Sequence, residues 1–444
     1  MIIIKKIFEI SLIFVNQLLI PTAIKLNLTN LIYYLFKLNL TEIKKISPKK
    51  KLYKIVVLSK LGGDRDLYLS QKKYNKNIVF YNIPRSFFKI IFNYFIDDHY
   101  DLNDYKYFLR KKDLDSKKKK YREFLEKLIL KIQKNLNINC FIGFNFTYKA
   151  ERELQAACQK SHVKFITLHK ESVGTELEFK VIKHIYKNYI GKYRGDKIAV
   201  YNDIEKKLLI STKIAKKKDI EVIGCSRLDE CFKYRKITPK KIILYYILDY
   251  QRGLPNRFFD IYKNGELNKI KGLNYDFRKI SWKRLHIKII ENLKQFSKNN
   301  KDVEVILKGK QGYFHLSDYE NLPKNFKVLY GGTGEHLLKD AKLVIGWNST
   351  SVLEAIAANR FLIHPLFFGK KSFLKEASLR LNLNKQSVLL NENQFQKKLY
   401  YFINKKYNKN ILNNNIYPLK YYLNNTNGTS GKKLNNFILK NLKK

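Results

Sequence analysis

Short apolar runs alternate with helical segments twice along this chain, and this alternation limits its fold more than any other feature. The first series contains "YKIVVLSKLGGDRD" (53–66), "KNIVFYNIP" (76–84), "INCFIGFNF" (138–146) and "VKFITLHKE" (163–171). Each run is apolar almost without a break, which is typical of a strand that is buried on both faces. Strands that alternate with helices form parallel sheets covered by helices, so this part is predicted to be one α/β unit.

A second series of the same kind begins at "KKIILYYILDYQRG" (240–253). It continues through "DVEVILKGK" (302–310), "KLVIG" (342–346) and "RFLIHPLF" (360–367). The join between the two series contains Pro239 and several lysines, as linkers do. We therefore predict an α/β protein of two tandem Rossmann-like, doubly wound domains that face a cleft, which is where ligands of open parallel sheets bind.

The same pattern predicts four parts of the chain. Residues 1–50 form an apolar and basic N-terminal segment, 51–235 and 236–385 are the two Rossmann-like domains, and 386–444 form a helical tail rich in Asn, Lys and Tyr.

The N-terminal segment carries two apolar stretches. The first, 10–24, is about 15 residues long and thus shorter than the ~20 residues that span a bilayer. Lys5 and Lys6 precede it as in a signal peptide, but no small-x-small cleavage site follows. The second is "LIYYLFKLNL" (31–40). The two stretches are expected to be helices that either pack on the body of the protein or lie in a membrane interface.

The formal net charge of +50 would suit a nucleic-acid-binding protein, but the distribution of the charge argues against this. Lysine far outnumbers arginine and is spread along the whole chain, together with abundant Asn, Ile, Tyr and Phe. These residues share AT-rich codons, so a genomic bias explains the composition. No nucleic acid is expected as a partner, although the charge favours anionic membrane surfaces and anionic substrates.

The four cysteines, Cys140, Cys158, Cys225 and Cys231, form no CxxC pair and have no nearby histidine at metal-ligand spacing. We expect reduced and mostly buried thiols, as in a cytoplasmic protein, and no structural zinc.

The stretch "KLVIGWNSTSVLEAIAANRFLIHP" (342–365) combines a strand, a hydroxyl-rich loop and an alanine-rich helix. Ser349, Thr350 or Ser351 is predicted to cap the helix, whose first-turn N–H groups and partial positive charge suit a phosphate. Glu354 could accept hydrogen bonds from the two ribose hydroxyls of a nucleoside diphosphate. Ser351 and Glu354 also satisfy the capping-box pattern, so the segment alone leaves both interpretations open.

The surrounding sequence resembles the C-terminal domain of GT-B glycosyltransferases. The glycine loop "YGGTGEHLLKDA" (330–341) lies a short way upstream, and "VIGCSRLDE" (222–230) carries Gly224, Arg227 and Asp229 in a G-x-x-R-x-D pattern. The chain is similar to bacterial surface-polysaccharide glycosyltransferases and, more distantly, to CDP-glycerol glycerophosphotransferases and UDP-GlcNAc 2-epimerases.

The resemblance covers about residues 53–368 and implies an acceptor domain at 51–235 and a nucleotide-donor domain at 236–385. The residues that it implies for the donor nucleotide are Gly331, Gly332, Thr333, Gly334, Asn348, Ser349, Thr350, Ser351 and Glu354. Many relatives have Gly-Pro or Gly-Lys-Pro after the alanine-rich helix, whereas Asn359-Arg360-Phe361 stands here. This departure leaves the fold prediction intact but assigns no subfamily.

Catalytic and acceptor-side candidates lie at strand ends of the first domain. His169 or Glu171 could be the general base that deprotonates an acceptor hydroxyl, and Lys170 could meet a phosphate. Gly62 and Gly63 form a loop that would approach the acceptor or the donor phosphates. A solvated strand end with a Lys–Glu pair and a plain glycine turn are the alternative interpretations.

Cations at other strand ends could neutralise the diphosphate leaving group. The candidates are Lys308, Lys310 and Arg227, and the last of these could instead brace the domain junction through Asp229. No acidic DxD-like pair follows a strand, so no metal site is predicted; helix dipoles and cations are expected to stabilise the leaving group.

The sequence thus predicts a glycosyltransferase that moves a sugar or phospho-polyol from a nucleotide-activated donor to a surface polysaccharide or a lipid-linked acceptor. The nucleotide sugar is the donor substrate, and no cofactor is expected. We expect the protein in the cytoplasm, with the inner membrane surface as a possible partner. A nucleotide-sugar 2-epimerase-like enzyme and a non-catalytic basic protein that binds polyanions are the alternatives.

Overall fold

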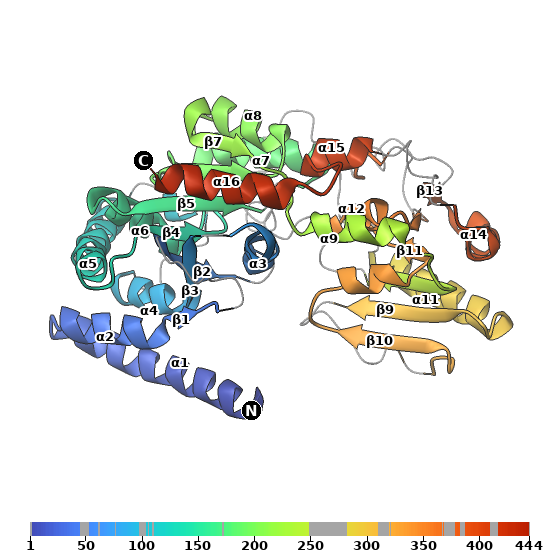
Figure 1. Ribbon diagram of the computed structural model, residues 1–444, viewed down its shortest axis with the longest axis horizontal. Helices are drawn as coiled ribbons and strands as arrows, with labels where there is room; N and C mark the ends of the chain where they lie inside the picture. The colour runs from blue at the N-terminus through green and yellow to red at the C-terminus, as the bar shows by residue number, and fades with distance from the viewer. Residues whose placement is uncertain are drawn as a thin grey trace. The chain divides into compact units, whose positions relative to one another are not determined.

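The computed structural model describes residues 2–44, 53–60, 63–75, 77–96, 104, 106–108, 111–170, 173–247, 282–309, 319, 321–365, 367, 378–381, 387–408 and 416–443, without the side chains of 2–10, 282 and 387–390. These residues form two compact units (Figure 1). Unit 1 comprises Met1–Ser172, Ile185–Arg227 and Ser430–Lys444, and unit 2 comprises Val173–His184 and Leu228–Thr429.

Unit 1 is built on a seven-stranded sheet with the order β1-β3-β2-β4-β5-β6-β7. Its strands are β1 (Thr41–Glu42), β2 (Tyr53–Ser59), β3 (Ile78–Pro84), β4 (Cys140–Gly143), β5 (Lys164–His169), β6 (Lys197–Val200) and β7 (Ile220–Val222). All strands after the short antiparallel β1 run parallel to one another. The strand order reverses between β2 and β4, which is the position where doubly wound sheets bind ligands.

Helices cover both faces of this sheet because successive residues of each buried strand point to opposite sides. In β2, Val56 and Leu58 join the core under α1, α2, α4, α5 and α6, whereas Ile55 and Val57 join the core under α3 and α16. The helices are α1 (Ile2–Lys25), α2 (Thr29–Asn39), α3 (Gly63–Tyr74), α4 (Arg85–Phe95), α5 (Lys112–Leu136), α6 (Lys149–Lys160), α8 (Asp203–Ser211) and α16 (Ser430–Leu442). The helix α7 (Glu176–Tyr189) begins in unit 2 and ends in unit 1.

Unit 2 contains a six-stranded parallel sheet with the order β10-β9-β8-β11-β12-β13. Its strands are β8 (Ile242–Tyr246), β9 (Glu304–Gly309), β10 (Phe326–Tyr330), β11 (Leu343–Ile345), β12 (Phe361–Pro365) and β13 (Ser387–Leu390). In chain order this is 3-2-1-4-5-6, the strand order of the Rossmann fold, and it reverses between β8 and β11. The prediction of two Rossmann-like, doubly wound sheets is confirmed.

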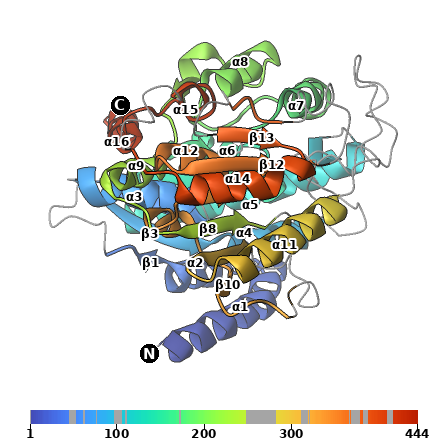
Figure 2. The same ribbon diagram turned by 90° about the vertical axis from the view of Figure 1, so that its right-hand side faces the viewer.

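The two faces of the second sheet carry different helices. On one face α11 (Trp282–Asn299) and α14 (Glu392–Asn404) pack together over a core that includes Tyr245, Leu307 and Ile345 (Figure 2). On the other face α12 (Thr350–Ala357) contacts α9 (Leu228–Lys233), α15 (Tyr417–Leu423) and the 3-10 helix η9 (Glu335–Lys339). The segment "EHLLKDA" (335–341), which follows the glycines of the predicted loop, thus begins with a short 3-10 helix.

The last part of the chain completes both units. Within 386–444, for which the sequence predicts a helical tail, β13 adds the last strand to the sheet of unit 2. The helices α14 and α15 also belong to unit 2, whereas α16 packs on α3 of unit 1 (Figure 1). The four cysteines are buried thiols that form no disulfide bonds, as predicted.

The N-terminal segment forms a helical hairpin that packs on α4 and α5 (Figure 1). The buried side-chain amides of Asn16 and Asn39 exchange two hydrogen bonds of 2.9 and 3.0 Å and so join α1 to α2. None of the helices in the described part of the chain is both long and apolar enough to cross a membrane. Yet the outer side of the hairpin is apolar, with Phe14 69%, Leu18 63% and Leu38 65% exposed.

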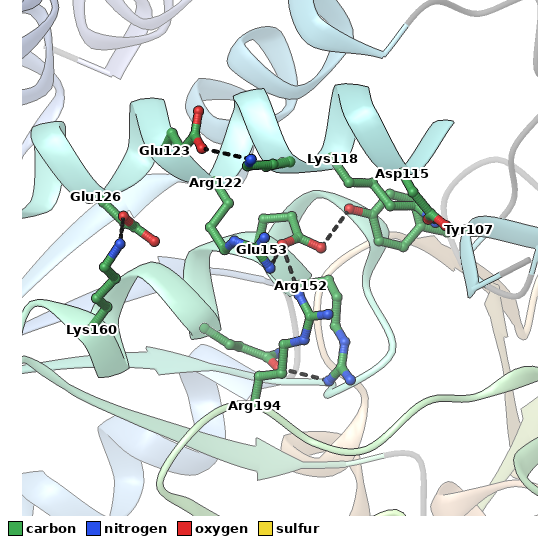
Figure 3. Close-up of polar contacts among 12 residues, drawn as sticks. Tyr107, Asp115, Lys118, Arg122, Glu123, Glu126, Arg152, Glu153, Lys160 and Arg194 are labelled. Carbon is green, nitrogen blue, oxygen red and sulfur yellow. Dashed lines mark hydrogen bonds and ion pairs between the residues drawn. The ribbon is translucent and has the colours of Figure 1, made fainter. Parts of the chain in front are cut away.

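A buried carboxylate braces the helical face of unit 1 (Figure 3). Glu153 on α6 is 2% exposed and accepts hydrogen bonds from Arg194 at 2.8 Å and from the Tyr107 hydroxyl at 3.1 Å. Arg122 on α5 lies 3.5 Å away. Burial and the neighbouring Arg194 lower the pKa of Arg152 to about 10, and its guanidinium lies 5.1 Å from the centre of the Phe108 ring. This network holds α5, α6 and the segment before β6 together and is structural in character.

Candidate functional site

The most distinctive local geometry in unit 2 lies between β11 and α12, beside the reversal of strand order. The helix α12 begins at Thr350, and its N-cap residue Ser349 has an extended backbone with φ −132° and ψ 160°. The Val352 N–H donates to the Ser349 carbonyl at 3.1 Å, so the first turn closes on Ser349. Ser351 is therefore inside the helix, and the capping box that pairs it with Glu354 is not formed.

The hydroxyl of Ser349 is not used as a cap. Among the described residues, no side-chain hydrogen bond closes the helix, and the Oγ atom is buried without a hydrogen-bond partner. The first N–H groups of any α-helix, here those of Thr350 and Ser351, have no intrahelical partner. No acidic residue occupies the first turn. The start of α12 thus combines an unpartnered hydroxyl, free main-chain donors and the positive end of a helix dipole, which together suit an anion.

Glu354 lies behind this turn and is 7% exposed. Burial raises the pKa of Tyr246, which lies at the end of β8, and the negative charge of Glu354 raises this pKa further. The Tyr246 hydroxyl donates to the Gly334 carbonyl at 3.2 Å. The structure therefore brings Glu354 and the predicted glycine loop to the same edge of the sheet.

The glycine loop needs glycine for two different reasons. Gly331 and Gly332 have φ angles of 60° and 61°, a left-handed conformation that disfavours other residues. Gly334 has no such angle, but a Cβ atom there would lie 2.8 Å from the Tyr246 ring. Thr333 stands between them and is partly exposed.

Lys308 supports this loop through its ammonium group. Its Nζ atom donates to the carbonyls of Gly309, at 3.0 Å, and of Gly331. Burial lowers the pKa of Lys308. Its described contacts are thus main-chain carbonyls, and Lys310, the other predicted cation, lies outside the described residues.

Asn348 ties the loop before α12 to a distant segment. It adopts a φ of 35°, and its Oδ1 atom accepts a hydrogen bond from the Leu379 N–H at 3.0 Å. At Gly346 a Cβ atom would lie 3.0 Å from Val352, so this glycine lets the loop approach the helix closely.

His364 belongs to the same edge and was missed by the sequence reasoning. It lies in β12, 1% exposed, with its ring centre 4.3 Å from that of Trp347. Its Nε2 atom is buried and has no hydrogen-bond partner in the part of the chain that the structure describes. Burial lowers the pKa of the imidazole to about 3, so the ring is neutral. The signal that could have identified it is a polar side chain near the carboxyl end of an otherwise apolar strand.

In unit 1, His169 occupies the predicted strand end of β5 but is 1% exposed. Its Nε2 atom lies 3.3 Å from Glu205, which also accepts a hydrogen bond of 3.0 Å from the Tyr186 hydroxyl. The Phe146 ring centre is 4.8 Å from the imidazole. His169 therefore forms a buried His–Glu pair, and Glu171 lies outside the described residues.

Gly63 and Lys170 both lie next to Phe144, at the carboxyl edge of the sheet of unit 1. A Cβ atom on Gly63 would lie 2.3 Å from the Phe144 ring, so a close approach explains this glycine. The Lys170 N–H donates to the Phe144 carbonyl at 3.4 Å. Burial raises the pKa of Asp64, and the charge of Lys170 is among the contacts that oppose this. Gly62 lies outside the described residues.

Arg227 is braced by a carboxylate other than the one suggested by the sequence. Its Nη1 atom lies 3.5 Å from Asp66, and its N–H donates to the same carboxylate at 3.0 Å. Asp229 instead accepts a hydrogen bond of 2.6 Å from Asn425. Asp66 on α3 therefore braces Arg227 within unit 1, and the suggested pairing of Arg227 with Asp229 stays a prediction.

When the chain is compared with known proteins, matches are found only among solved structures. No protein-family model matches the chain, and no curated protein does. The UDP-GlcNAc 2-epimerase of Methanocaldococcus jannaschii is 12% identical, with a TM-score of 0.41 over 87% of this chain and 99% of that one. The epimerase of Neisseria meningitidis is 9% identical, with a TM-score of 0.49 over 88% and 100%. A glycosyltransferase of Rickettsia africae is 14% identical, with a TM-score of 0.48 over 89% and 99%. At these values no residue role in this chain follows from the likeness.

Proposed function

We propose that the protein is a glycosyltransferase that moves a sugar, or a related phospho-polyol, from a nucleotide-activated donor to a surface glycan or lipid-linked acceptor. The observation that carries this proposal is the unpartnered Ser349 hydroxyl at the start of α12, beside the reversal of strand order in a Rossmann sheet. Ligands of such sheets bind at this position.

The donor would bind to unit 2. The diphosphate accepts hydrogen bonds from the Ser349 hydroxyl and from the N–H groups of Thr350 and Ser351. Glu354 accepts from ribose hydroxyls, and the glycine loop at 331–334 borders the base. In sugar transfer the bond between the sugar and the diphosphate breaks, and negative charge grows on the nucleoside diphosphate that leaves. In phospho-polyol transfer the bond between the two phosphates breaks, and a nucleoside monophosphate leaves. In either case the helix dipole stabilises the charge on the leaving phosphate. This stabilisation requires no metal ion.

The acceptor would bind to unit 1. A general base must remove a proton from the acceptor hydroxyl, and His169 stays the candidate, with Glu205 in place to stabilise the imidazolium. Because His169 is buried, it reaches an acceptor only if the residues that cover it move when the substrate binds.

Nucleotide binding tests the donor site. We expect one of UDP, CDP and GDP to raise the melting temperature and to bind with a measurable Kd. Loss of a hydrogen bond to a charged group costs about 1.5–3 kcal/mol, so Glu354→Gln should weaken binding by roughly 10- to 100-fold. Ser349→Ala should weaken it by a smaller factor. Glu392→Gln, which changes a carboxylate 38% exposed on α14, is the matched control and should bind as the wild type does.

The alternatives give different results in the same experiments. Binding of anionic polymers with a steep salt dependence, indifferent to Glu354→Gln, together with no response to any nucleotide would favour the polyanion-binding protein. A change of configuration in the nucleotide sugar without release of the nucleotide diphosphate would favour the 2-epimerase-like enzyme. Transfer to an added acceptor supports the proposal, with release of the nucleoside diphosphate for a sugar or of the nucleoside monophosphate for a phospho-polyol.

We further propose that the N-terminal hairpin lies on the inner surface of the cytoplasmic membrane, where a lipid-linked acceptor would be found. Phe14, Leu18 and Leu38 are exposed on it, and the exposed lysines Lys25 and Lys37 stand on the same two helices. Apolar side chains with lysines beside them are typical of helices that bind anionic interfaces.

Vesicle binding tests this surface. We expect the protein to sediment with vesicles that contain phosphatidylglycerol and much less with neutral phosphatidylcholine vesicles. The double variant Phe14→Ser/Leu18→Ser should reduce binding at least tenfold, because it removes two of the three most exposed apolar side chains of the hairpin. Tyr400→Ser/Tyr401→Ser changes two exposed aromatic residues of α14 and should leave binding unchanged. Equal binding by the wild type and the Phe14/Leu18 variant would contradict the proposal.

A further inference from the structure

A buried lysine lies at the carboxyl edge of the sheet of unit 2. Lys308 in β9 is 8% exposed, and among the described residues it forms no ion pair with a carboxylate. Burial lowers its pKa, and no charge in the described part of the chain opposes this effect. Lysine side chains are rarely buried unless a partner compensates their charge. The donor site proposed above does not use this cation.

One hydrogen-bond donor of the ammonium group remains. An ammonium group carries three N–H donors. The Lys308 Nζ atom donates to the carbonyl of Gly309 at 3.0 Å and to the carbonyl of Gly331. The third donor has no acceptor in the part of unit 2 that the structure describes. It is therefore available to an oxygen atom of a ligand.

The glycine loop leaves open space beside this lysine. A Cβ atom on Gly332, the neighbour of Gly331, would have no heavy atom within 4 Å. At Gly334, by contrast, a Cβ atom would lie 3.4 Å from the Lys308 Cγ atom and 2.8 Å from the Tyr246 ring. The loop thus packs against Lys308 at Gly334 and faces open space at Gly332, where the flat ring of a base can lie without a clash.

The order of the strands determines which part of a donor nucleotide reaches Lys308. In the order β10-β9-β8-β11, Lys308 lies two strands away from β11, whose loop leads to α12. Strands are about 4.8 Å apart, so Lys308 lies roughly 10 Å along the edge from the start of α12. Tyr246 at the end of β8 lies between them, because it contacts Gly334 and its pKa responds to Glu354. With the phosphates at α12 and the ribose at Glu354, the base comes next, and its edge farthest from the ribose is nearest to Lys308.

The nucleobases differ at this far edge. Uracil and guanine carry an oxo group there, whereas cytosine and adenine carry an amino group. An ammonium group donates to an oxo group, but it has no lone pair with which to accept from an amino group. An amino group placed against Lys308 would therefore lose its own hydrogen bond and leave the third N–H donor unsatisfied, which discriminates against that base.

We propose that Lys308 selects a donor whose base carries an oxo group at its far edge. The donor is then a uridine or guanosine nucleotide and not a cytidine or adenosine nucleotide. That the base lies at this part of the edge rests on the proposed function, because the ribose was assigned to Glu354 there.

Matched pairs of nucleotides test this selection. UDP and CDP have bases of the same size that differ at the far edge, and GDP and ADP form a second such pair. In calorimetric titration we expect UDP to bind at least tenfold more tightly than CDP, or GDP at least tenfold more tightly than ADP, as for loss of a hydrogen bond to a charged group.

Two variants of Lys308 should remove this preference. Lys308→Met should raise the Kd of the preferred nucleotide until the two members of the pair bind alike. Lys308→Gln should also bind both alike while it keeps a polar side chain at the loop, because an amide can donate to an oxo group or accept from an amino group. Lys298→Met, at an exposed position of α11, is the control and should keep the wild-type preference.

The outcomes separate this inference from the proposed function. UDP and CDP carry the same phosphates, so an equal loss of affinity for both in Lys308→Met would assign the lysine to the phosphates and overturn the inference. Binding of CDP or ADP as tight as that of its partner, and weakened by Glu354→Gln, would also overturn the inference but support the donor site. Absence of binding by all four nucleotides would contradict both.

Discussion

Replacing Arg360 with methionine is expected to lower the free energy of unfolding of unit 2 by about 4 kcal/mol, the range for breaking a buried charged network. Arg360 is fully buried, and its guanidinium donates five hydrogen bonds. The acceptors are the carbonyls of Leu338 (2.6 Å), Ile237 (3.3 Å), Tyr234 (3.0 Å) and Lys339 (3.0 Å) and the hydroxyl of Tyr407 (3.0 Å). Methionine fills much of the volume but removes all five of these hydrogen bonds, and each buried acceptor that is left unsatisfied costs about 1–3 kcal/mol.

Urea unfolding, followed by hydrogen exchange of the peptides around 234–237 and 338–339, measures this effect. Arg360→Lys should lose nearly as much stability, since one ammonium group cannot reach acceptors arranged around a planar guanidinium. Arg284→Met, at an exposed position of α11, is the matched control and should change stability by less than about 0.5 kcal/mol. A loss below about 1 kcal/mol in Arg360→Met would show that the five hydrogen bonds do not hold the unit together.

The second large effect is a loss of stability in acid that depends on His364. Burial lowers the pKa of this imidazole to about 3, whereas in the unfolded chain the pKa is about 6.5. The stability that depends on the neutral ring is therefore present above pH 6.5 and is lost as the pH falls from there towards 3. At pH 5 the loss is about 2 kcal/mol, because each pH unit below 6.5 costs about 1.4 kcal/mol.

His364→Phe removes the titrating group and keeps a ring beside Trp347. We expect the difference in unfolding free energy between variant and wild type to shift by about 2 kcal/mol in favour of the variant between pH 7.5 and pH 5. Other titrating groups, such as Glu151, act equally in both proteins and cancel in this difference. His336→Gln, at an exposed position, is the control and should follow the wild-type curve. Parallel curves for His364→Phe and the wild type would contradict the assignment.

The strand–helix alternation was sufficient to predict the two parallel sheets. Each buried strand must be apolar along its whole length, and this pattern can be recognised in a single sequence. The predicted donor residues also meet at one edge, since Gly334 and Glu354 both lie near Tyr246. Carboxyl ends of parallel strands share one edge, so this convergence follows from the topology.

The sequence could not predict which residues contact one another across long distances in the chain. That Ser349, and not Thr350 or Ser351, is the N-cap residue of α12 depends on how the loop 346–349 packs, and the Ser349 hydroxyl has no hydrogen-bond partner among the described residues. The return of α16 to α3 and the pairing of Arg227 with Asp66 join segments far apart in the chain. No local pattern identifies such partners.

The sequence by itself determined the fold class, since burial of a parallel sheet dictates continuous apolar strands. It also determined where each unit changes from strand to loop, since glycine and hydroxyl residues mark those ends. Only the tertiary structure decided what the polar residues do. In the sequence, Arg360 is only a departure from the pattern of the family that the chain resembles. The structure shows that five hydrogen-bond acceptors surround its guanidinium. Hydrogen bonding and charge pairing act over a few ångströms in space, and the fold alone sets which residues come within that distance.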